Sequence, residues 1–467
     1  MKEKLVDSLK NLISGKVTAE KEFLDFYSLD SSAYSKRPRL IVFPNTVDDV
    51  KKTIRFAKKR KIPVCARGGS TGLVGSSLTT GIILDMKNFN KIKLSKNYVI
   101  VGAGVSKGEL DLILKRNKKF LGPNPSVGAF CKIGGMIANN SSGSRSLKYG
   151  SVIDNLLEIV LVDGNGTEII LPKNKTISKK IAKISNETDH LYPHVTKNSA
   201  GYRLDVVTEN NSQKIIAGSE STLGIIVQAK LRIFDIPKKR QLTVVGFNRL
   251  EDALYLVPYI LRLNPSSLEF VDETVIKNIP HKFKDKPKCL LMIEFDANVT
   301  KSQKNLDSLI RQFSIIFTSN KKSDVEKWWS YRDSALFFTL KNIPKNQLVP
   351  HVIEDATVPP ENLKYLVTFL KKIAKKYRLK FVIYGHAGNG NLHIRLISNS
   401  KRNLDRLHKE FFSFVISLDG TISGEHGDGI ARTKYLKLQY SPHLLQKFQY
   451  IKKQFDPSGI LNPGNII

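Results

Sequence analysis

The chain has 467 residues, of which 41% are hydrophobic and 25% charged, which indicates a soluble globular protein of two or three domains. No apolar run approaches the length that spans a bilayer, and the first residues lack the apolar core of a signal peptide. We therefore expect a cytoplasmic protein and leave peripheral association with the inner face of the membrane open. The net charge of +33 is spread along the chain without any nucleic-acid-binding motif, so we expect no nucleic-acid partner and read it as attraction of acidic substrates or lipids.

The three cysteines, Cys65, Cys131 and Cys289, lie far apart and form no CxxC pair. Because an iron–sulfur cluster takes four thiolates, the chain cannot hold one, and no disulfide framework is indicated. Any electron relay beyond an organic cofactor must therefore lie on another protein.

Residues 1–36 predict a helical lead-in, since leucines recur there at helical spacing before a serine-rich loop. A βαβ unit follows, with strands expected at residues 40–43 and 62–66. Between them, residues 46–50 open a helix with a threonine cap and an acidic first turn.

Glycine-rich loops follow the predicted strands. Residues 67–75 form a loop rich in glycine and hydroxyl groups, which is how backbone N–H groups are brought to a pyrophosphate. Alone this loop is weak evidence for a pyrophosphate site, because tight turns also need glycine and the loop matches neither a dinucleotide fingerprint nor a Walker loop. Residues 122–126, 133–150 and 218–227 are similarly dense in small residues, which allows a flat, extended ligand to approach closely. A strand at residues 156–162 continues the sheet.

After residue 237 the pattern changes to a ferredoxin-like βαββαβ layer. We expect strands at residues 242–247, 268–271, 290–295 and 315–318, and helices at residues 250–263 and 303–313. The following segment, residues 328–333, reads Trp-Trp-Ser-Tyr-Arg-Asp, and on its own pattern it is an aromatic helix stripe with a solvated arginine.

Two short histidine-bearing stretches, residues 385–393 and 423–429, carry the strongest chemical signal. Apolar alternation predicts strands on both sides of the first glycine-rich turn, with His393 and Arg395 on one face. His386 enters the same turn, so His386 and His393 are expected to face one another across the mouth of a hairpin.

Two imidazoles and one carboxylate form a ligand set typical of a catalytic divalent metal, and His426 is left over as a base. The alternative is that these histidines are ordinary polar turn residues and that the glycines only permit positive φ. The gathering of histidines and carboxylates in two such loops favours a site.

These segments, in this order, resemble the FAD-binding domain of the vanillyl-alcohol oxidase type flavoproteins. With the C-terminal motifs the chain is similar to the group of D-lactate dehydrogenase, the glycolate oxidase catalytic subunit and D-2-hydroxyglutarate dehydrogenase. The resemblance implies an α+β fold: a two-subdomain FAD-binding domain of the PCMH type, a ferredoxin-like cap domain and a C-terminal segment returning to the flavin. The implied bounds are 1–36 for the lead-in, 37–237 for the FAD-binding domain, 238–410 for the cap and 411–467 for the last segment.

The resemblance also implies the residues that bind FAD. They are Arg67, Gly68, Gly69, Ser70, Thr71, Gly72, Pro125, Ser126, Gly134, Gly135, Asn139, Asn140, Gly143, Tyr149, Gly150, Glu220, Gly224, Ile226 and Asn462. Family members that tether the flavin covalently through the first loop carry histidine where this chain has Ser70, so non-covalent FAD is expected.

Carried over by resemblance, His386, His393 and Glu425 bind a divalent metal, zinc by expectation, and His426 is the general base. A 2-hydroxy acid chelates such a metal, which lowers the hydroxyl pKa, while a neutral imidazole takes the proton as hydride leaves for the flavin. Arg332, Arg395 or Arg432 would fix the substrate carboxylate bidentately. The implied activity is that of an FAD-dependent 2-hydroxy-acid dehydrogenase or oxidase acting on a CH–OH donor such as D-lactate or glycolate.

Several positions depart from the hydroxyglutarate dehydrogenases of this family. Residues 353–359 lack the lysine that precedes the aspartate of their Asp-x-x-x-Pro element, and Asn389 replaces a common aspartate. The pairs Glu354-Asp355 and His393-x-Arg395 look more like the branch fused to a cysteine-rich iron–sulfur domain. We therefore expect a separate iron–sulfur or quinone-linked protein as electron acceptor.

Two alternatives remain open. A non-redox FAD enzyme of the alkylglycerone-phosphate synthase kind shares the FAD domain, but its site lacks the paired metal constellation. The FAD subunit of a multi-subunit oxidase, without catalysis of its own, would be expected to lack the metal set.

Overall fold

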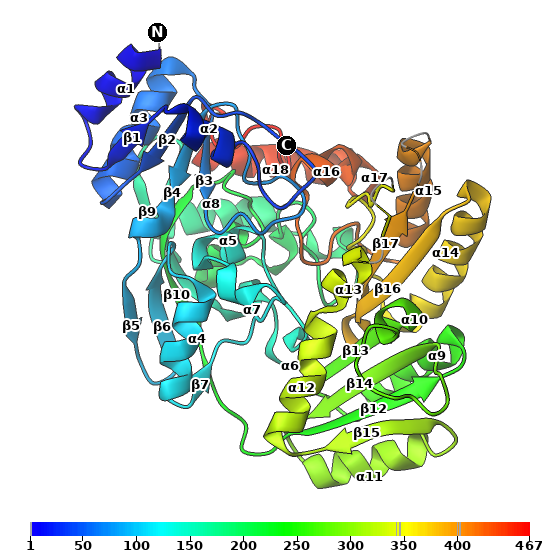
Figure 1. The fold of residues 1–467 in the computed structure, drawn as a ribbon. Coiled ribbons are helices and arrows are strands. Elements are labelled where there is room, and N and C mark those ends of the chain that lie inside the picture. Colours follow the sequence, from blue (N-terminus) through cyan, green and yellow to red (C-terminus); the bar gives the residue numbers. More distant parts are fainter. Residues whose placement is uncertain (1, 342, 345–346, 399, 401–402) are drawn as a thin grey trace.

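The computed structural model describes residues 2–341, 343–344, 347–398, 400 and 403–467, and Figure 1 shows their arrangement. The first sheet has the strand order β1-β2-β4-β3. Strands β2 (Leu40–Phe43), β4 (Ile82–Asp85) and β3 (Val64–Arg67) run parallel, as a βαβ unit requires, and helix α3 (Val47–Arg60) connects β2 to β3. Thr46 caps α3, and its side chain accepts a hydrogen bond from the backbone N–H of Asp49.

The lead-in differs from the expected helical segment. Helices α1 (Lys2–Lys10) and α2 (Lys21–Tyr27) flank a strand, β1 (Lys16–Thr18), which pairs antiparallel with β2. Three residues are too few for a period-two pattern to reveal a strand, and pairing with the edge of the first sheet decides its conformation.

The second sheet is antiparallel, with the strand order β5-β6-β10-β8-β9. Its strands are β5 (Ile92–Leu94), β6 (Tyr98–Gly102), β10 (Ile225–Arg232), β8 (Leu156–Val162) and β9 (Glu168–Leu171). Strand β8 has the bounds expected from the sequence. Helices α4 (Lys107–Arg116), α5 (Ile133–Ala138), α6 (Ser146–Tyr149), α7 (Val152–Asn155) and α8 (Lys175–Ser185) and the small strands β7 (Lys119–Phe120) and β11 (Phe234–Asp235) complete this part of the molecule.

The third sheet has six strands in the order β15-β12-β14-β13-β16-β17. Its first four strands have the ferredoxin-like arrangement that the sequence predicts: β12 (Gln241–Phe247), β13 (Ser267–Asp272), β14 (Cys289–Phe295) and β15 (Ser314–Ser319). Helices α9 (Leu250–Leu261) and α11 (Val299–Leu309) provide the two crossovers, and the four-residue helix α10 (Glu273–Ile276) follows β13.

The histidine-bearing hairpin extends this sheet. Strands β16 (Lys380–His386) and β17 (Asn391–Ile397) pair antiparallel, and β16 also pairs with β13, where Phe270 lies opposite Gly385. The register places Tyr384 opposite His393, so His386 and His393 occupy diagonal positions on the same face.

The two faces of the third sheet bury separate cores. Alternation along β13 sends Leu268 and Phe270 into the main core and Val271 into a second, smaller one. The smaller core contains Trp328 and Trp329 of α12 (Lys322–Asp333), whereas the main core includes residues of α9 and α14 (Leu363–Tyr377). Helix α12 therefore covers one face of the sheet, and α9 and α14 cover the other (Figure 1).

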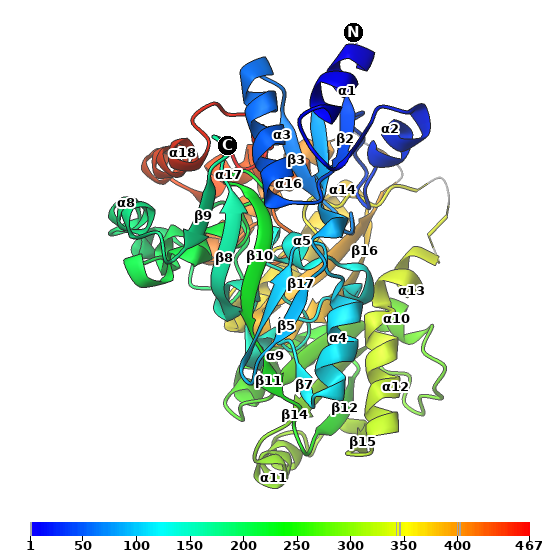
Figure 2. The same ribbon diagram turned by 90° about the vertical axis from the view of Figure 1, so that its left-hand side faces the viewer.

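The C-terminal segment returns to the first two sheets. After α13 (Ala335–Lys341), α14 and α15 (Leu404–Ser417), the short helices α16 (Gly429–Arg432) and α17 (Leu436–Gln439) lead into α18 (Pro442–Phe455), which lies beside α8 (Figure 2). Beyond α18, the backbone of residues 460–462 pairs with Val64 at the edge of β3: Val64 N–H donates to Ile460 at 2.8 Å, and Asn462 N–H donates to Val64 at 2.8 Å. The end of the described chain thus lies against the glycine-rich loop that follows β3.

Candidate functional site

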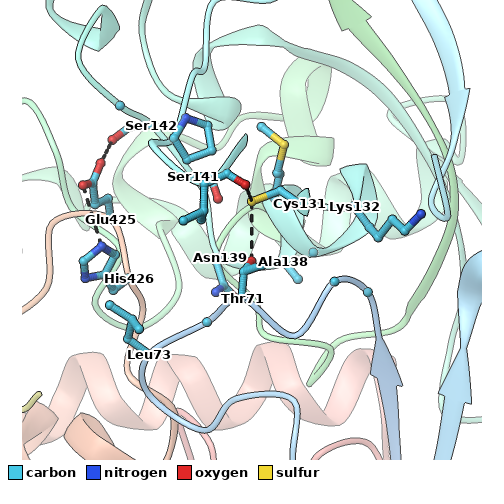
Figure 3. A pocket seen from close by; sticks show the side chains of 18 of the residues that line it. Thr71, Leu73, Cys131, Lys132, Ala138, Asn139, Ser141, Ser142, Glu425 and His426 are labelled. Atoms are coloured by element: carbon cyan, nitrogen blue, oxygen red, sulfur yellow. Dashed lines mark hydrogen bonds and ion pairs between the residues drawn. The ribbon is translucent and has the colours of Figure 1, made fainter. Parts of the chain in front are cut away.

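A long cleft runs between the glycine-rich loops of the first two sheets and the histidine face of the third sheet. Its empty space is about 1580 Å³, part of it open to solvent. Figure 3 shows Thr71, Asn139 and Ser142 on the loop side and Glu425 and His426 on the other. Fourteen of the residues implied to bind FAD line the cleft, namely Arg67, Gly68, Gly69, Ser70, Thr71, Gly72, Pro125, Ser126, Gly134, Gly135, Asn139, Gly143, Glu220 and Ile226.

Five residues of that set lie outside the lining: Asn140, Tyr149, Gly150, Gly224 and Asn462. Asn140 is buried and accepts a hydrogen bond from the backbone N–H of Ile153 at 2.9 Å, which fixes the loop behind the cleft. The amide nitrogen of Asn462 donates to the backbone carbonyl of Glu220 at 2.6 Å. Both therefore support the cleft wall from outside.

The loop side of the cleft fits an extended, flat cofactor such as FAD. A Cβ added at Gly135 would meet no atom within 4 Å, so its backbone borders open space. Gly69 differs, since a Cβ there would lie 2.3 Å from the carbonyl oxygen of Phe130, and this glycine is required for loop packing. Small residues on the lining let backbone amide groups reach a ligand directly.

Three imidazoles surround one oxygen of Glu425 at the end of the cleft. Oε1 of Glu425 lies 3.1 Å from Nε2 of His386 and 3.2 Å from Nε2 of His393. Nε2 of His426 is 3.8 Å from the same oxygen, and the ring of His426 stacks on that of His393 with 5.1 Å between centroids. The structure thus brings together His386 and His393 of the first histidine-bearing stretch with Glu425 and His426 of the second.

This geometry fits a metal ion held by His386, His393 and Glu425. Ligand atoms at about 2.0–2.1 Å from one zinc ion stand roughly 3.3 Å apart in a tetrahedral site, close to the observed distances. Nδ1 of His386 lies 2.8 Å from Oε1 of Glu269, the carboxylate–histidine arrangement that orients a ligating imidazole.

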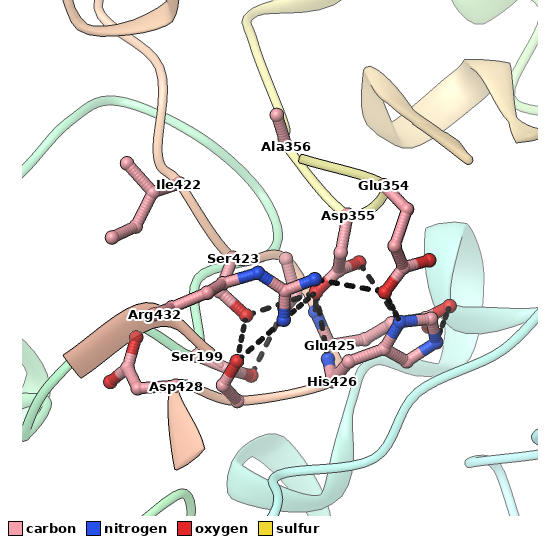
Figure 4. Close-up of polar contacts among 12 residues, drawn as sticks. Ser199, Glu354, Asp355, Ala356, Ile422, Ser423, Glu425, His426, Asp428 and Arg432 are labelled. Carbon is pink, nitrogen blue, oxygen red and sulfur yellow. Dashed lines mark hydrogen bonds and ion pairs between the residues drawn. The ribbon is translucent and has the colours of Figure 1, made fainter. Parts of the chain in front are cut away.

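A second grouping is also close, since Asp355, His393, Glu425 and His426 each offer an atom within 4.8 Å of the others. However, Oδ2 of Asp355 accepts hydrogen bonds from the backbone N–H groups of Glu425 and His426 and from the hydroxyl of Ser423 (Figure 4). The carboxylate of Asp355 therefore already holds the turn that carries Glu425 and His426.

The other oxygen of Glu425 is held by two residues from the loop side. Oε2 lies 3.0 Å from Nζ of Lys197, and Ser142 donates its hydroxyl to it. Burial opposes the charged carboxylate of Glu425, but Lys197 and His386 outweigh it and hold its pKa well below the usual range. Glu425 is therefore an anion, as a metal ligand must be.

His426 and His393 have opposite electrostatic surroundings. Burial lowers the pKa of His393 to about 4, so this imidazole is neutral and able to bind metal. Burial opposes the charged form of His426 too, but the carboxylates of Glu354 and Asp355 outweigh it and raise the pKa of His426 to about 9. Nδ1 of His426 lies 2.6 Å from Glu354, which fixes the ring and leaves Nε2 facing Glu425.

The three candidate arginines differ in what they can still bind. Arg332 lines the cleft and donates Nε–H to Glu269 at 2.6 Å, while Nη2 lies 3.4 Å from His386. Arg395 also lines the cleft, yet each of its nitrogens has a protein partner, among them Glu354. Arg432 is fully buried, lies outside the lining and donates to three backbone carbonyls and to Glu354.

Sequence reasoning missed Glu269 and Lys197, which contact the proposed ligands. Glu269 lies on β13 within an apolar strand, and Lys197 lies in a polar segment without glycine clusters. A carboxylate at a fully buried strand position is a recognisable signal, because such a group needs a charged partner. Nothing local distinguishes Lys197 from the many other lysines of this chain.

Two family models match the chain. Residues 38–171 match the FAD binding domain, and residues 236–466 match the C-terminal domain of FAD linked oxidases. D-lactate dehydrogenase of Archaeoglobus fulgidus is 30% identical over 95% of this chain and 96% of that protein. A glycolate oxidase subunit of Bacillus subtilis is 28% identical over 94% of this chain and 91% of its own length.

Solved structures share the fold. p-Cresol methylhydroxylase superposes with a TM-score of 0.73 over 99% of this chain and 96% of that protein, at 14% identity. Alkyldihydroxyacetonephosphate synthase gives a TM-score of 0.72 over 99% of this chain and 85% of that protein, at 18% identity. Among the described helices, none is long and apolar enough to cross a membrane.

Proposed function

Because the chain belongs to the FAD linked oxidase family, we propose that it is an FAD-dependent dehydrogenase that oxidises a 2-hydroxy acid to the 2-oxo acid. The observation that carries the proposal is the convergence of His386 and His393 on one oxygen of Glu425, with His426 beside them, on the cleft side opposite the FAD loops. Among the relatives are D-lactate dehydrogenases, a glycolate oxidase subunit and D-2-hydroxyglutarate dehydrogenases, which supports a 2-hydroxy acid as substrate.

FAD would be held without a covalent link by the glycine-rich loops that line the cleft and would supply the hydride acceptor for C2 of the substrate. A divalent cation, which we propose to be zinc, would be held by His386, His393 and Glu425 and would supply Lewis acidity toward the substrate hydroxyl and positive charge that lowers the pKa of neighbouring groups. Glu269 and Lys197 would orient His386 and Glu425, the roles that their contacts support.

His426 is the proposed base. Its Nδ1 is engaged by Glu354, so Nε2 is the nitrogen that would accept the hydroxyl proton as the C2–H bond breaks and the C–O bond becomes a carbonyl. Without the cation, the pKa of His426 of about 9 keeps the imidazole protonated at neutral pH. Nearby positive charge would favour the neutral form that a base requires.

Arg332 is the proposed partner of the substrate carboxylate. It lies on the cleft, and no partner of its Nη1 is found among the residues that the structure describes. Arg395 would instead position Glu354 and Tyr384, because its donors are already committed to the protein. Arg432, from a buried position, would stabilise the carboxylate of Glu354.

The test is anaerobic reduction of the bound flavin by a panel of D- and L-2-hydroxy acids, before and after treatment with a chelator. We expect bleaching by a small D-2-hydroxy acid, loss of bleaching after metal removal, and recovery with zinc. His426→Ala should lower the rate by about 10²-fold or more while FAD stays bound. Bleaching that is indifferent to both the chelator and this substitution would refute the mechanism.

We also propose that the reduced flavin passes its electrons to a separate iron–sulfur or quinone-linked protein. The three cysteines lie apart and buried, so no cluster can form on the described chain. The expected result is fast reoxidation by a quinone analogue or a redox dye and slow reoxidation by oxygen. Full turnover with oxygen alone would contradict this acceptor.

The likeness to alkyldihydroxyacetonephosphate synthase extends to the fold alone. A non-redox reaction of that kind has no evident use for the His386, His393 and Glu425 set. The same bleaching assay separates the two functions, because only the dehydrogenase is expected to give a reduced flavin with a 2-hydroxy acid.

A further inference from the structure

Two carboxylates from opposite sides hold the turn that carries His426. Oδ2 of Asp355 accepts the backbone N–H of Glu425 at 3.0 Å and that of His426 at 2.8 Å. Oε1 of Glu220 accepts the N–H of Asp428 at 2.6 Å, and Oε2 accepts that of Gly429 at 3.0 Å. Four backbone N–H groups around the imidazole-bearing residue therefore end on a carboxylate.

Glu220 reaches this turn from the flavin side of the cleft. It precedes β10, lines the cleft beside Ile226, and is itself only 2% exposed. Its backbone has a left-handed φ of +50°, as does Ser221 with φ +62°, a region that residues other than glycine occupy only where surrounding contacts fix them. The hydrogen bond from Asn462 to the carbonyl oxygen of Glu220 is one such contact.

The turn is shaped to receive this carboxylate. Gly427 has φ +82°, and a Cβ at this position would lie 2.3 Å from Oε1 of Glu220. Only glycine lets the carboxylate come close enough to bind the two following amides. On the other side, the hydroxyl oxygen of Ser423 lies 2.9 Å from Oδ2 of Asp355 and 2.9 Å from the carbonyl oxygen of Gly427, so its proton can be donated to either acceptor within the turn.

We propose that Glu220 is a positioning residue for His426. Its hydrogen bonds fix the turn, and with it the imidazole, from the flavin side of the cleft, while those of Asp355 fix the turn from the side of the metal ligands. The proposal rests on the proposed function, in which His426 takes the substrate proton. The family resemblance implies a contact between Glu220 and FAD. In the structure Glu220 lines the cleft, and both of its carboxylate oxygens accept backbone N–H groups of the turn.

The physical consequence concerns the rate more than substrate binding. Proton transfer requires the base within about 2.6–3.2 Å of the hydroxyl oxygen, and a displacement of about 1 Å costs roughly 10²-fold. The groups proposed to bind substrate, Arg332 and the three metal ligands, do not contact Glu220 directly. Replacing one acceptor oxygen of Glu220 by an amide group should therefore loosen the turn, reduce the rate of hydride and proton transfer and leave substrate affinity nearly unchanged.

The test compares Glu220→Gln with Asp163→Asn in the FAD-loaded, metal-loaded protein. Asp163 is the matched control: it is likewise a buried carboxylate that accepts two backbone N–H groups, from Asn165 at 2.9 Å and Thr167 at 2.7 Å, but it does not line the cleft. Three quantities are measured: the limiting rate of anaerobic flavin reduction by D-lactate, the apparent Kd for D-lactate, and hydrogen exchange of the amides in residues 424–430.

For Glu220→Gln we expect a limiting rate lower by about 10- to 100-fold, an apparent Kd within about threefold of the wild type, normal FAD content, and faster exchange in residues 424–430. Asp163→Asn should change neither the rate nor the exchange. Should Glu220→Gln fold poorly, Gly427→Ala displaces the same carboxylate from the turn and should reproduce the rate loss and the exchange.

An unchanged rate, or loss of FAD with unchanged exchange in the turn, would overturn the positioning role. If the wild-type flavin is reduced by no 2-hydroxy acid, the proposed function fails. Hydrogen exchange still decides whether Glu220 holds the turn, because that measurement requires no turnover.

Discussion

The proposed active site is a balanced set of buried charges. Four carboxylates, Glu269, Glu354, Asp355 and Glu425, face four cations, Lys197, Arg332, Arg395 and Arg432, and all eight side chains are largely removed from solvent. Buried charges persist only when paired, so each carboxylate depends on its cation. A bound divalent cation would leave the site with excess positive charge, which suits an anionic substrate.

Lys197 is the residue at which this dependence can be tested. It is fully buried, and Glu425 is the carboxylate that it contacts, so Lys197→Met should leave Glu425 without its compensating charge. We expect the metal content and the rate of flavin reduction to fall by roughly 10- to 100-fold. Lys107→Met is the control for metal content, since Lys107 is also a buried lysine but contacts Asp111 and Asn124 and none of the proposed metal ligands. Equal metal content in the two variants would contradict this role.

Asp333 offers a test of substrate charge. It follows Arg332, is exposed and lines the cleft on the α12 side, so its carboxylate should repel a substrate that carries a second carboxylate. Asp333→Lys should raise kcat/KM for D-malate or D-2-hydroxyglutarate relative to D-lactate by roughly tenfold. Glu326→Lys makes the same charge change at an exposed position of α12 away from the cleft lining and should leave the ratio unchanged. A ratio that moves equally in both variants would show a general charge effect.

At the scale of elements, local patterns predicted the bounds of strands and helices better than they predicted which strands pair with each other. Strands β2 and β8 have the expected bounds, and the ferredoxin-like layer appears in the expected order. The hairpin of β16 and β17 was expected from alternation, but its pairing with β13 joins Phe270 to Gly385, more than a hundred residues apart. Such pairing depends on tertiary packing, which no local period encodes.

A buried histidine between two C-terminal elements provides a stability prediction. His408 of α15 is 6% exposed and its Nδ1 lies 3.1 Å from the hydroxyl of Tyr435. Burial lowers the pKa of His408 to about 4. In the unfolded chain this histidine has a pKa near ~6.5 and takes up a proton as the pH falls below that value, whereas in the folded protein it stays neutral down to about pH 4. The unfolded state is therefore favoured, and stability is lost, as the pH falls from ~6.5 to 4.

Replacement of His408 by Gln should remove this proton-linked loss. Between pH 6.5 and 5, the free energy of unfolding of the variant should decrease by roughly 2 kcal/mol less than that of the wild type. Thermal unfolding followed from pH 7 to 5 measures the difference. His443→Gln, at an exposed position of α18, is the control and should keep the wild-type slope. Parallel slopes for all three proteins would show that His408 is not titrating in this range.

For the whole molecule, the sequence indicates the four residues that meet at the cleft but not the residues that contact them. His386, His393, Glu425 and His426 stand in glycine-flanked stretches, which mark them locally, and the fold brings them together. Lys197 and Glu269 come from segments distant in sequence, and their importance follows only from the three-dimensional approach of the sheets. Arg432 is the opposite case. It stands in a local motif of the sequence, but its side chain is fully buried and contacts Glu354 instead of lining the cleft.

The net charge of +33 is a property of the entire molecule and affects how an anionic substrate arrives. A positive field raises the local concentration of anions and the association rate, and salt screens it with a Debye length of about 10 Å at 0.1 M. We expect kcat/KM for D-lactate to fall several-fold between 20 mM and 500 mM salt, while kcat stays nearly constant, because buried pairs at the site are screened much less. Steady-state kinetics at increasing sodium chloride, repeated with sodium sulfate at equal ionic strength, measure this. An unchanged kcat/KM would show that the charge has no part in substrate capture, and a parallel fall in kcat would place the salt effect at the site itself.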